Sequence, residues 1–198
     1  MNAFTTHSGR AVVLRRSDVD TDQIIPSDWL KRVERTGFGA GLFSEWREDP
    51  DFVLNRPESA GASILLAGRD FGTGSSREHA VWALQDYGFR AVVSPRFGDI
   101  FRSNALKGGL LPVQLDAEVV EALMQRVEAD PSLEVVVDLE ARELRAGDLV
   151  SAFPLDDFTR WRLLEGLDDI GLTLRTEGDI ATFEAGRPAH LPTTTLGA

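Results

Sequence analysis

One glycine- and serine-rich stretch constrains this chain more than any other. Residues 68–79 read Gly-Arg-Asp-Phe-Gly-Thr-Gly-Ser-Ser-Arg-Glu-His. They follow the apolar run of residues 63–67, whose length suits a buried strand, and precede apolar residues at helical spacing. Because glycine lets the backbone bend sharply, the sequence predicts a strand, a tight turn and the start of a helix.

The start of this helix is a candidate anion site. Ser75 or Ser76 is expected to be the N-cap, and Glu78 stands three residues after Ser75, as a capping box requires. Arg77 is expected in the first turn, where the helix dipole disfavours a cation unless a ligand compensates it. Free first-turn amides beside Arg77 favour a bound anion. The simpler interpretation is a well-capped helix after a tight turn.

The stretch matches neither common phosphate-binding motif, because it lacks the Gly-Lys-Ser/Thr of the Walker loop and the glycine spacing of the dinucleotide fingerprint. Residues 70–79 instead resemble the signature of the swivel domain in the aconitase superfamily. Residues 18–26 (Asp-Val-Asp-Thr-Asp-Gln-Ile-Ile-Pro), 35–39 and 101–112 resemble further motifs of one branch, the small subunits of 3-isopropylmalate dehydratase. The likeness runs over most of the chain, from about residue 4 to 167.

The resemblance implies an α/β swivel domain, with a mixed or parallel sheet and packed helices in β/β/α layers. Residues 1–176 are expected to form it, and the polar residues 177–198 are expected to be a C-terminal tail. Residues 68–75 should lie at the carboxyl end of a central strand, where open α/β sheets bind ligands. The apolar patterns predict strands at residues 11–14, 63–67, 91–94, 110–113 and 133–139, and a hairpin around 146–148. They also predict helices at 98–106 and 117–128. A last helix is expected to begin near Pro154, to bury Leu155, Phe158 and Trp161, and to end at Gly171.

The resemblance also implies the catalytic roles. Ser75 would act as an alkoxide-like base that takes the Cα proton of a hydroxy acid. Ser76 and Arg77 would bind a substrate carboxylate, and Arg35 and Thr36 would contact the substrate from a loop. Since a free serine is a very poor base, donors such as helix amides must stabilise its anion.

Four further residues are expected to support the site. Asp22 would be a partner of the catalytic hydroxyl, and Gly74 would offer a backbone amide. Glu78 is expected to cap the helix, and His79 to support the residues that touch the substrate.

The loop of residues 31–41 has three glycines within five residues, at 37, 39 and 41, and several cations. This composition predicts a mobile lid over an acidic substrate, poorly ordered without substrate or partner. An ordinary flexible surface loop is the alternative.

Composition excludes several classes of protein. The net charge of −11 argues against a nucleic-acid surface, although a local cationic pocket can still bind an anionic substrate. No cysteine is present, so this chain forms no disulfide and offers no thiolate to zinc or an iron–sulfur cluster. Asp18, Asp20 and Asp22 do not form a calcium loop, because its glycine and glutamate positions hold Gln23 and Trp29. No metal site, no membrane span and a cytoplasmic location are expected.

The function that the resemblance implies is a hydro-lyase of leucine biosynthesis. It would isomerise 2-isopropylmalate and 3-isopropylmalate by dehydration and rehydration. A larger partner subunit would carry a [4Fe-4S] cluster, in a heterodimer or higher assembly, and this chain alone would be inactive. Two alternatives stay open: the small subunit of a homoaconitase, dimethylmalate or citraconate type of hydro-lyase, and a non-catalytic anion-binding module.

Overall fold

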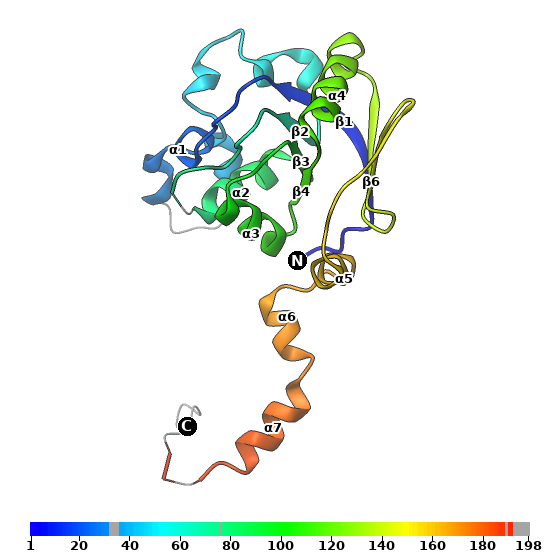
Figure 1. Ribbon diagram of the computed structural model, residues 1–198. Coiled ribbons are helices and arrows are strands. Elements are labelled where there is room, and N and C mark those ends of the chain that lie inside the picture. Colours follow the sequence, from blue (N-terminus) through cyan, green and yellow to red (C-terminus); the bar gives the residue numbers. More distant parts are fainter. Residues whose placement is uncertain (32–35, 76, 189, 192–198) are drawn as a thin grey trace.

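A mixed sheet organises the chain (Figure 1). The computed structural model describes residues 1–31, 36–75, 77–188 and 190–191. Within them, seven strands lie in the order β4-β3-β2-β1-β5-β6-β7. Strands β1 to β4 pair in parallel, and β5 to β7 continue from β1 in antiparallel pairs, so the predicted mixed sheet is confirmed. The strands are β1 (Thr6–Leu14), β2 (Ile64–Ala67), β3 (Ala91–Ser94), β4 (Leu111–Gln114), β5 (Glu134–Asp138), β6 (Glu143–Ala146) and β7 (Leu149–Ala152).

Helices connect the parallel strands and follow the last hairpin. They are α1 (Thr21–Ile24), α2 (Glu78–Tyr87), α3 (Asp99–Gly108), α4 (Ala117–Ala129), α5 (Asp157–Glu165), α6 (Asp169–Leu174) and α7 (Glu177–Ala185). Short 3-10 helices fill the long connection between α1 and β2: η1 (Ser27–Lys31), η2 (Phe38–Gly41), η3 (Trp46–Glu48), η4 (Val53–Asn55) and η5 (Pro57–Ser59). The predicted strand–turn–helix–strand order is therefore confirmed for β2, α2 and β3.

Two apolar clusters pack on the two faces of the parallel strands. Leu65 of β2 joins the first cluster, with residues of α2 and α3, whereas its neighbours Ile64 and Leu66 join the second, with residues of α4 and of β5 and β6. All four residues of β2 are buried. Burial on both faces explains why this strand is a continuous apolar run rather than an alternating one.

Strand β1 changes partner halfway along its length. Its first half pairs with β5, from Thr6 opposite Asp138 to Arg10 opposite Glu134. Its second half, which begins at Ala11, pairs with β2. The sequence predicted only this second half, because the first half is polar and partly exposed and gives no apolar signal.

The predicted last helix is wrong in its extent. Helix α5 begins after Asp156, whose side chain accepts a hydrogen bond from Thr159 N at 2.9 Å, and it ends at Gly166. Gly171 lies inside the separate helix α6. The predicted burial of Phe158 is also wrong, since 58% of this residue is exposed. A second aspartate cap at the start of α6 divides the segment into two helices.

Beyond α5, the chain leads away from the sheet as α6 and α7 (Figure 1). Every residue of α7 is exposed. The domain boundary at residue 176 stays a prediction.

Candidate active site

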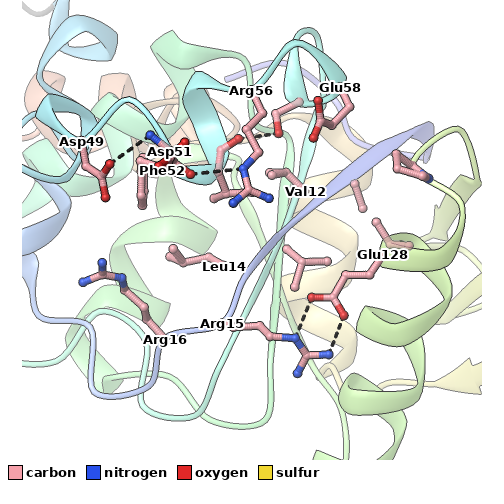
Figure 2. Close-up of a pocket in the computed structure, with 16 residues that line it drawn as sticks. Val12, Leu14, Arg15, Arg16, Asp49, Asp51, Phe52, Arg56, Glu58 and Glu128 are labelled. Atoms are coloured by element: carbon pink, nitrogen blue, oxygen red, sulfur yellow. Dashed lines mark hydrogen bonds and ion pairs between the residues drawn. The ribbon is translucent and has the colours of Figure 1, made fainter.

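A cavity beside β1 does not contain the predicted site residues. It has a volume of about 500 Å³ and lies between the end of β1, residues 49–59 and the end of α4. Figure 2 shows that two of its three arginines already form hydrogen bonds. Arg15 Nε donates to Glu128 Oε1 at 2.6 Å, and Arg56 Nε donates to Asp51 O at 3.1 Å. The third arginine, Arg16, lies over the ring of Trp46, 4.1 Å from its centroid. Because all three guanidinium groups have partners, the cavity is a poor candidate for an anion site.

The glycine-rich loop of residues 68–75 leaves the carboxyl end of β2, between β1 and β3, as predicted. The loop that follows β1 holds it through the backbone. Gly72 N donates to Val19 O at 2.7 Å, and Thr21 N donates to Thr73 O at 3.0 Å. This pairing fixes the backbone just before Ser75.

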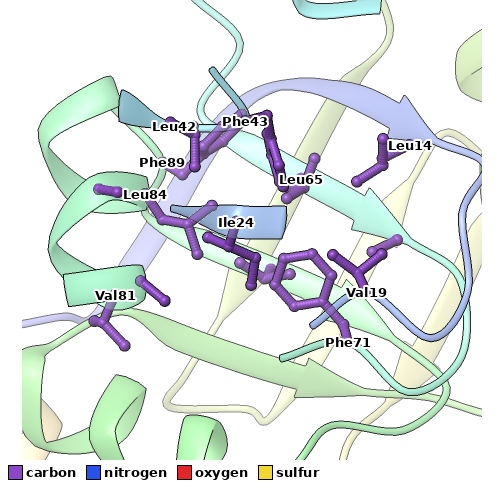
Figure 3. Packing of buried hydrophobic residues seen from close by; sticks show 14 of the residues in the cluster. Leu14, Val19, Ile24, Leu42, Phe43, Leu65, Phe71, Val81, Leu84 and Phe89 are labelled. Carbon is purple, nitrogen blue, oxygen red and sulfur yellow. The ribbon is translucent and has the colours of Figure 1, made fainter. Parts of the chain in front are cut away.

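The loop after β3 holds the other side of the same segment. Phe71 N donates to Arg96 O at 3.1 Å, and Gly98 N donates to Phe71 O at 2.9 Å. The Phe71 ring points into the first apolar cluster, near Val19 and Ile24 (Figure 3). Three loops at the carboxyl ends of parallel strands therefore meet around one buried ring.

Glycine is required at two points of this junction. At Gly72, where φ is +77°, a Cβ atom would lie 2.3 Å from Phe101 Cγ. At Gly98, a Cβ atom would lie 2.3 Å from Gly72 O. Side chains at these positions would separate the loops, because contacts this short are repulsive.

Ser75 is exposed, but a buried side chain holds its backbone in place. Its carbonyl oxygen accepts a hydrogen bond from Thr21 Oγ1 at 2.8 Å, and Thr21 is only 1% exposed. The Ser75 hydroxyl forms no hydrogen bond with any residue that the structure describes. The hydroxyl is thus held at the surface without a structural bond of its own.

The predicted capping role of Ser75 is wrong. The N-cap of α2 is Arg77, which has φ −127° and ψ 111°, and no side chain accepts from its first turn. Glu78 is therefore the first residue of the helix rather than the third, and no capping box forms there. The capping box lies instead at α1, between Asp20 and Gln23.

Arg77 precedes the helix and forms an ion pair with Asp22, through Nη1 and Oδ1. The Arg77 side chain is 18% exposed and that of Asp22 is 53% exposed. A carboxylate of α1 therefore supplies the compensation expected for this cation. The contact of Asp22 is with Arg77, and the role of Asp22 toward the Ser75 hydroxyl stays a prediction.

His79 packs between aromatic rings on the inner side of α2. Its ring centroid lies 5.2 Å from that of Phe38 and 4.7 Å from that of Trp82, both edge to face. Glu78 beside it is exposed. His79 therefore joins α2 to the segment of η2.

The predicted mobile loop is wrong for the part that forms η2. Phe38 is fully buried, and its amide donates to Asp86 Oδ2 at 2.9 Å. At Gly39 a Cβ atom would lie 2.8 Å from the backbone of Asp86. Gly39 thus permits close packing on α2 instead of motion. Thr36 is exposed, whereas the predicted substrate contacts Arg35 and Ser76 lie outside the described residues.

Comparison with known proteins places this arrangement in a family. The model described as Aconitase C-terminal domain matches residues 1–118. The 3-isopropylmalate dehydratase small subunit of Parafrankia sp. (strain EAN1pec) is 76% identical over 194 residues, which are 98% of this chain and 100% of that protein. This chain belongs to the family of 3-isopropylmalate dehydratase small subunits. The small subunit of Streptomyces avermitilis is 66% identical over 98% of both chains.

Two further family models match the second half of the chain. The LeuD_N model matches residues 121–157, and the model for the C-terminal domain of 3-isopropylmalate dehydratase small subunits matches residues 169–195. The crystal structure of 3-isopropylmalate dehydratase from Methanocaldococcus jannaschii is similar, with a TM-score of 0.67 and 25% identity over 89% of this chain and 98% of that one. The predicted family and the predicted aconitase-like α/β fold are confirmed.

The sequence has no cysteine, and the described ranges contain no group of three or more histidine, aspartate or glutamate side chains that could hold a metal ion. None of the described helices is both long and apolar enough to cross a membrane.

Sequence reasoning missed one residue of the site, Thr21. It lies inside the family motif of residues 18–26, but between acidic residues it gave no chemical signal of its own. Only the fold shows that its hydroxyl lies beneath the Ser75 carbonyl.

Proposed function

We propose that this chain is the small subunit of 3-isopropylmalate dehydratase, a hydro-lyase that interconverts 2-isopropylmalate and 3-isopropylmalate in leucine biosynthesis. One observation carries the proposal: the chain is 76% identical to such a small subunit over 98% of its length. The site agrees with it, because an exposed serine, whose carbonyl group is bound by Thr21, stands two residues before the paired Arg77.

Ser75 is proposed as the base. As the alkoxide, its Oγ takes the proton from Cα of the substrate. The electron pair of the C–H bond forms the C=C bond while the hydroxyl group leaves from the neighbouring carbon. The positive end of the α2 dipole, which begins three residues later at Glu78, favours the anionic form of the serine.

Arg77 is proposed to bind a substrate carboxylate. Its guanidinium group has five N–H donors in a planar fork, and Asp22 occupies only part of this fork. The ion pair therefore fixes the orientation of Arg77 and leaves donors for a two-pronged contact with a carboxylate. Ser76, Arg35 and Thr36 are proposed as further substrate contacts.

The large subunit is proposed to complete the site. Gly74, Ser75 and Asp22 are exposed, so this chain alone does not exclude water from the reaction. Removal of a hydroxyl group is helped by a Lewis acid, which a [4Fe-4S] cluster of the large subunit would supply. This chain has no cysteine, and the part of it that the structure describes holds no group of metal ligands. The heterodimeric or higher assembly and the cytoplasmic location stay predictions.

The test is Ser75→Ala in the enzyme reconstituted with its large subunit. We expect turnover of both isopropylmalates to fall by ~100-fold or more, because the variant lacks the base. The melting temperature should not change, because the hydroxyl bonds to no described residue. Absorbance of the dehydrated intermediate measures turnover. Ser17→Ala, at an exposed serine of the neighbouring loop, is the control and should keep full activity.

Near-normal turnover of Ser75→Ala would contradict the assignment of the base. If the wild-type enzyme is fully active on another malate analogue and inactive on the isopropylmalates, the chain belongs to a related hydro-lyase instead.

A further inference from the structure

Helices α6 and α7, here called the C-terminal arm (residues 169–185), expose large apolar side chains. Ile170 and Leu174 of α6, one helical turn apart, are 72% and 60% exposed, and Phe183 of α7 is 72% exposed. Large apolar side chains exposed along one segment point to an interaction site, since a soluble monomer rarely exposes large apolar patches.

The base of the arm is tied to the body of the protein. Asp168 caps α6 by accepting from Gly171 N at 2.7 Å. Asp169 accepts from Arg162 Nη2 at 2.8 Å and lies 3.6 Å from Lys107 Nζ of α3. These contacts give the arm a defined point of departure from the fold.

The outer part of the arm has no such partner. Every hydrogen bond of residues 176–187 found among the described residues stays within residues 173–187, as between Thr182 Oγ1 and Gly178 O at 2.8 Å. No residue of α7 is buried. Figure 1 shows α7 well away from the sheet. The apolar side chains of α7 are therefore available to another protein.

The charge of α7 argues against a second copy of the chain as the partner. Helix α7 carries three carboxylates, Glu177, Asp179 and Glu184, and no lysine or arginine. Two copies of the arm packed together would bring these carboxylates into contact, in a chain whose net charge is already −11. Like charges oppose such pairing, whereas a partner with a basic rim would attract the arm.

The family comparison shows that the arm is not peculiar to this chain. A separate family model, for the C-terminal domain of the small subunits, matches residues 169–195, so the arm recurs in proteins that are named small subunits. We propose that the C-terminal arm is the docking element for the large subunit, and that it inserts Leu174 and Phe183 into an apolar groove edged by lysine or arginine. This inference rests on the proposed function, which supplies the large subunit.

The test is to titrate the large subunit with the full chain and with single variants of it. Leu174→Ser and Phe183→Ser should each raise the Kd by ~10-fold or more, as for anchor residues of an interface. Val150→Ser, which removes a 59% exposed side chain from β7, is the control and should leave the Kd unchanged. Asp179→Lys should also weaken binding, and added salt should weaken binding of the wild-type chain, because attraction of α7 to a basic rim is screened.

Unchanged affinity of Leu174→Ser and Phe183→Ser, with wild-type melting temperatures, would overturn the docking proposal. So would a self-associating chain whose dimer is lost in Phe183→Ser, because a second copy would then cover the arm. Turnover is measured separately. A wild-type pair that binds but does not act on isopropylmalate refutes the proposed function, whereas a fully active pair that binds the variants equally well refutes only the docking role.

Discussion

The hydroxyl of Thr21 should position the catalytic serine without touching the substrate. Thr21→Val removes this hydroxyl and nearly keeps the shape of a residue that is 1% exposed. The Ser75 carbonyl then loses its 2.8 Å hydrogen bond, but water can replace it at this exposed residue. We therefore expect a loss of about 1 kcal/mol in the free energy of unfolding, at the lower end for a buried hydrogen bond. In a chain of this size, the melting temperature should fall by ~2–4 °C.

The effect on catalysis should be larger than the effect on stability. A shift of about 1 Å in a reacting group can lower the rate by ~100-fold, and Thr21 is the side chain that ties the Ser75 backbone to α1. We expect kcat of the reconstituted enzyme to fall by ~10-fold or more with little change in KM. Thr21→Ser keeps the hydroxyl and should restore most of kcat. Should Thr21→Val melt lower yet keep wild-type kcat, the hydroxyl is structural only and the positioning argument is refuted.

Three other changes follow from the geometry. Arg77→Lys should raise the apparent KM by ~10-fold with a smaller effect on kcat, because an ammonium group cannot keep both the contact with Asp22 and a two-pronged contact with a carboxylate; steady-state kinetics checks this. Gly72→Ala should lower the free energy of unfolding by about 3 kcal/mol in denaturant titration, because φ is +77° and the new Cβ would meet Phe101. Alanine at a helical glycine with open space around it should not lower the free energy of unfolding. Burial, and next the charge of Arg90, lower the pKa of His7 below its ordinary 6.5, so the unfolded chain takes up the proton first and the free energy of unfolding falls as the pH drops below about 6.5. His7→Gln should remove this part of the pH dependence of melting.

Controls separate these effects from general damage. Gly178→Ala is the matched glycine variant, since nothing lies within 4 Å of its added Cβ in α7. Loss of stability in Gly178→Ala equal to that in Gly72→Ala would contradict the steric argument. An unchanged pH profile in His7→Gln would show that other groups dominate this range.

The parallel half of the fold could be predicted because its strands bury both faces. Residues 64–67 and 91–94 gave short apolar runs, and both became central strands. The first half of β1 could not be found in this way. Its side chains are half exposed, and only pairing with β5, far along the chain, makes it a strand.

The position of the site could be predicted, but not its local contacts. The glycine-rich loop does leave a central strand, yet α2 begins only at Glu78, so the expected cap does not form. A glycine pattern alone could not tell mobility from close packing, and packing on Asp86 decides it for η2. The pair between Asp22 and Arg77 joins residues from two loops, and local sequence carries no signal for it.

The change of partner along β1 has a consequence for how the protein folds. The half of β1 that pairs with β2 belongs to a unit that ends with β4, so this layer can form before the chain beyond Gln114 takes part. The other half can form only when β5 pairs with β1, with Glu134 opposite Arg10, and this pairing requires closure of a long loop. We therefore expect an assembly in two steps, in which the catalytic turn is in place while residues 6–10 are still unpaired. In pulsed hydrogen exchange, amides of β2 and β3 should gain protection first and those of β5 last.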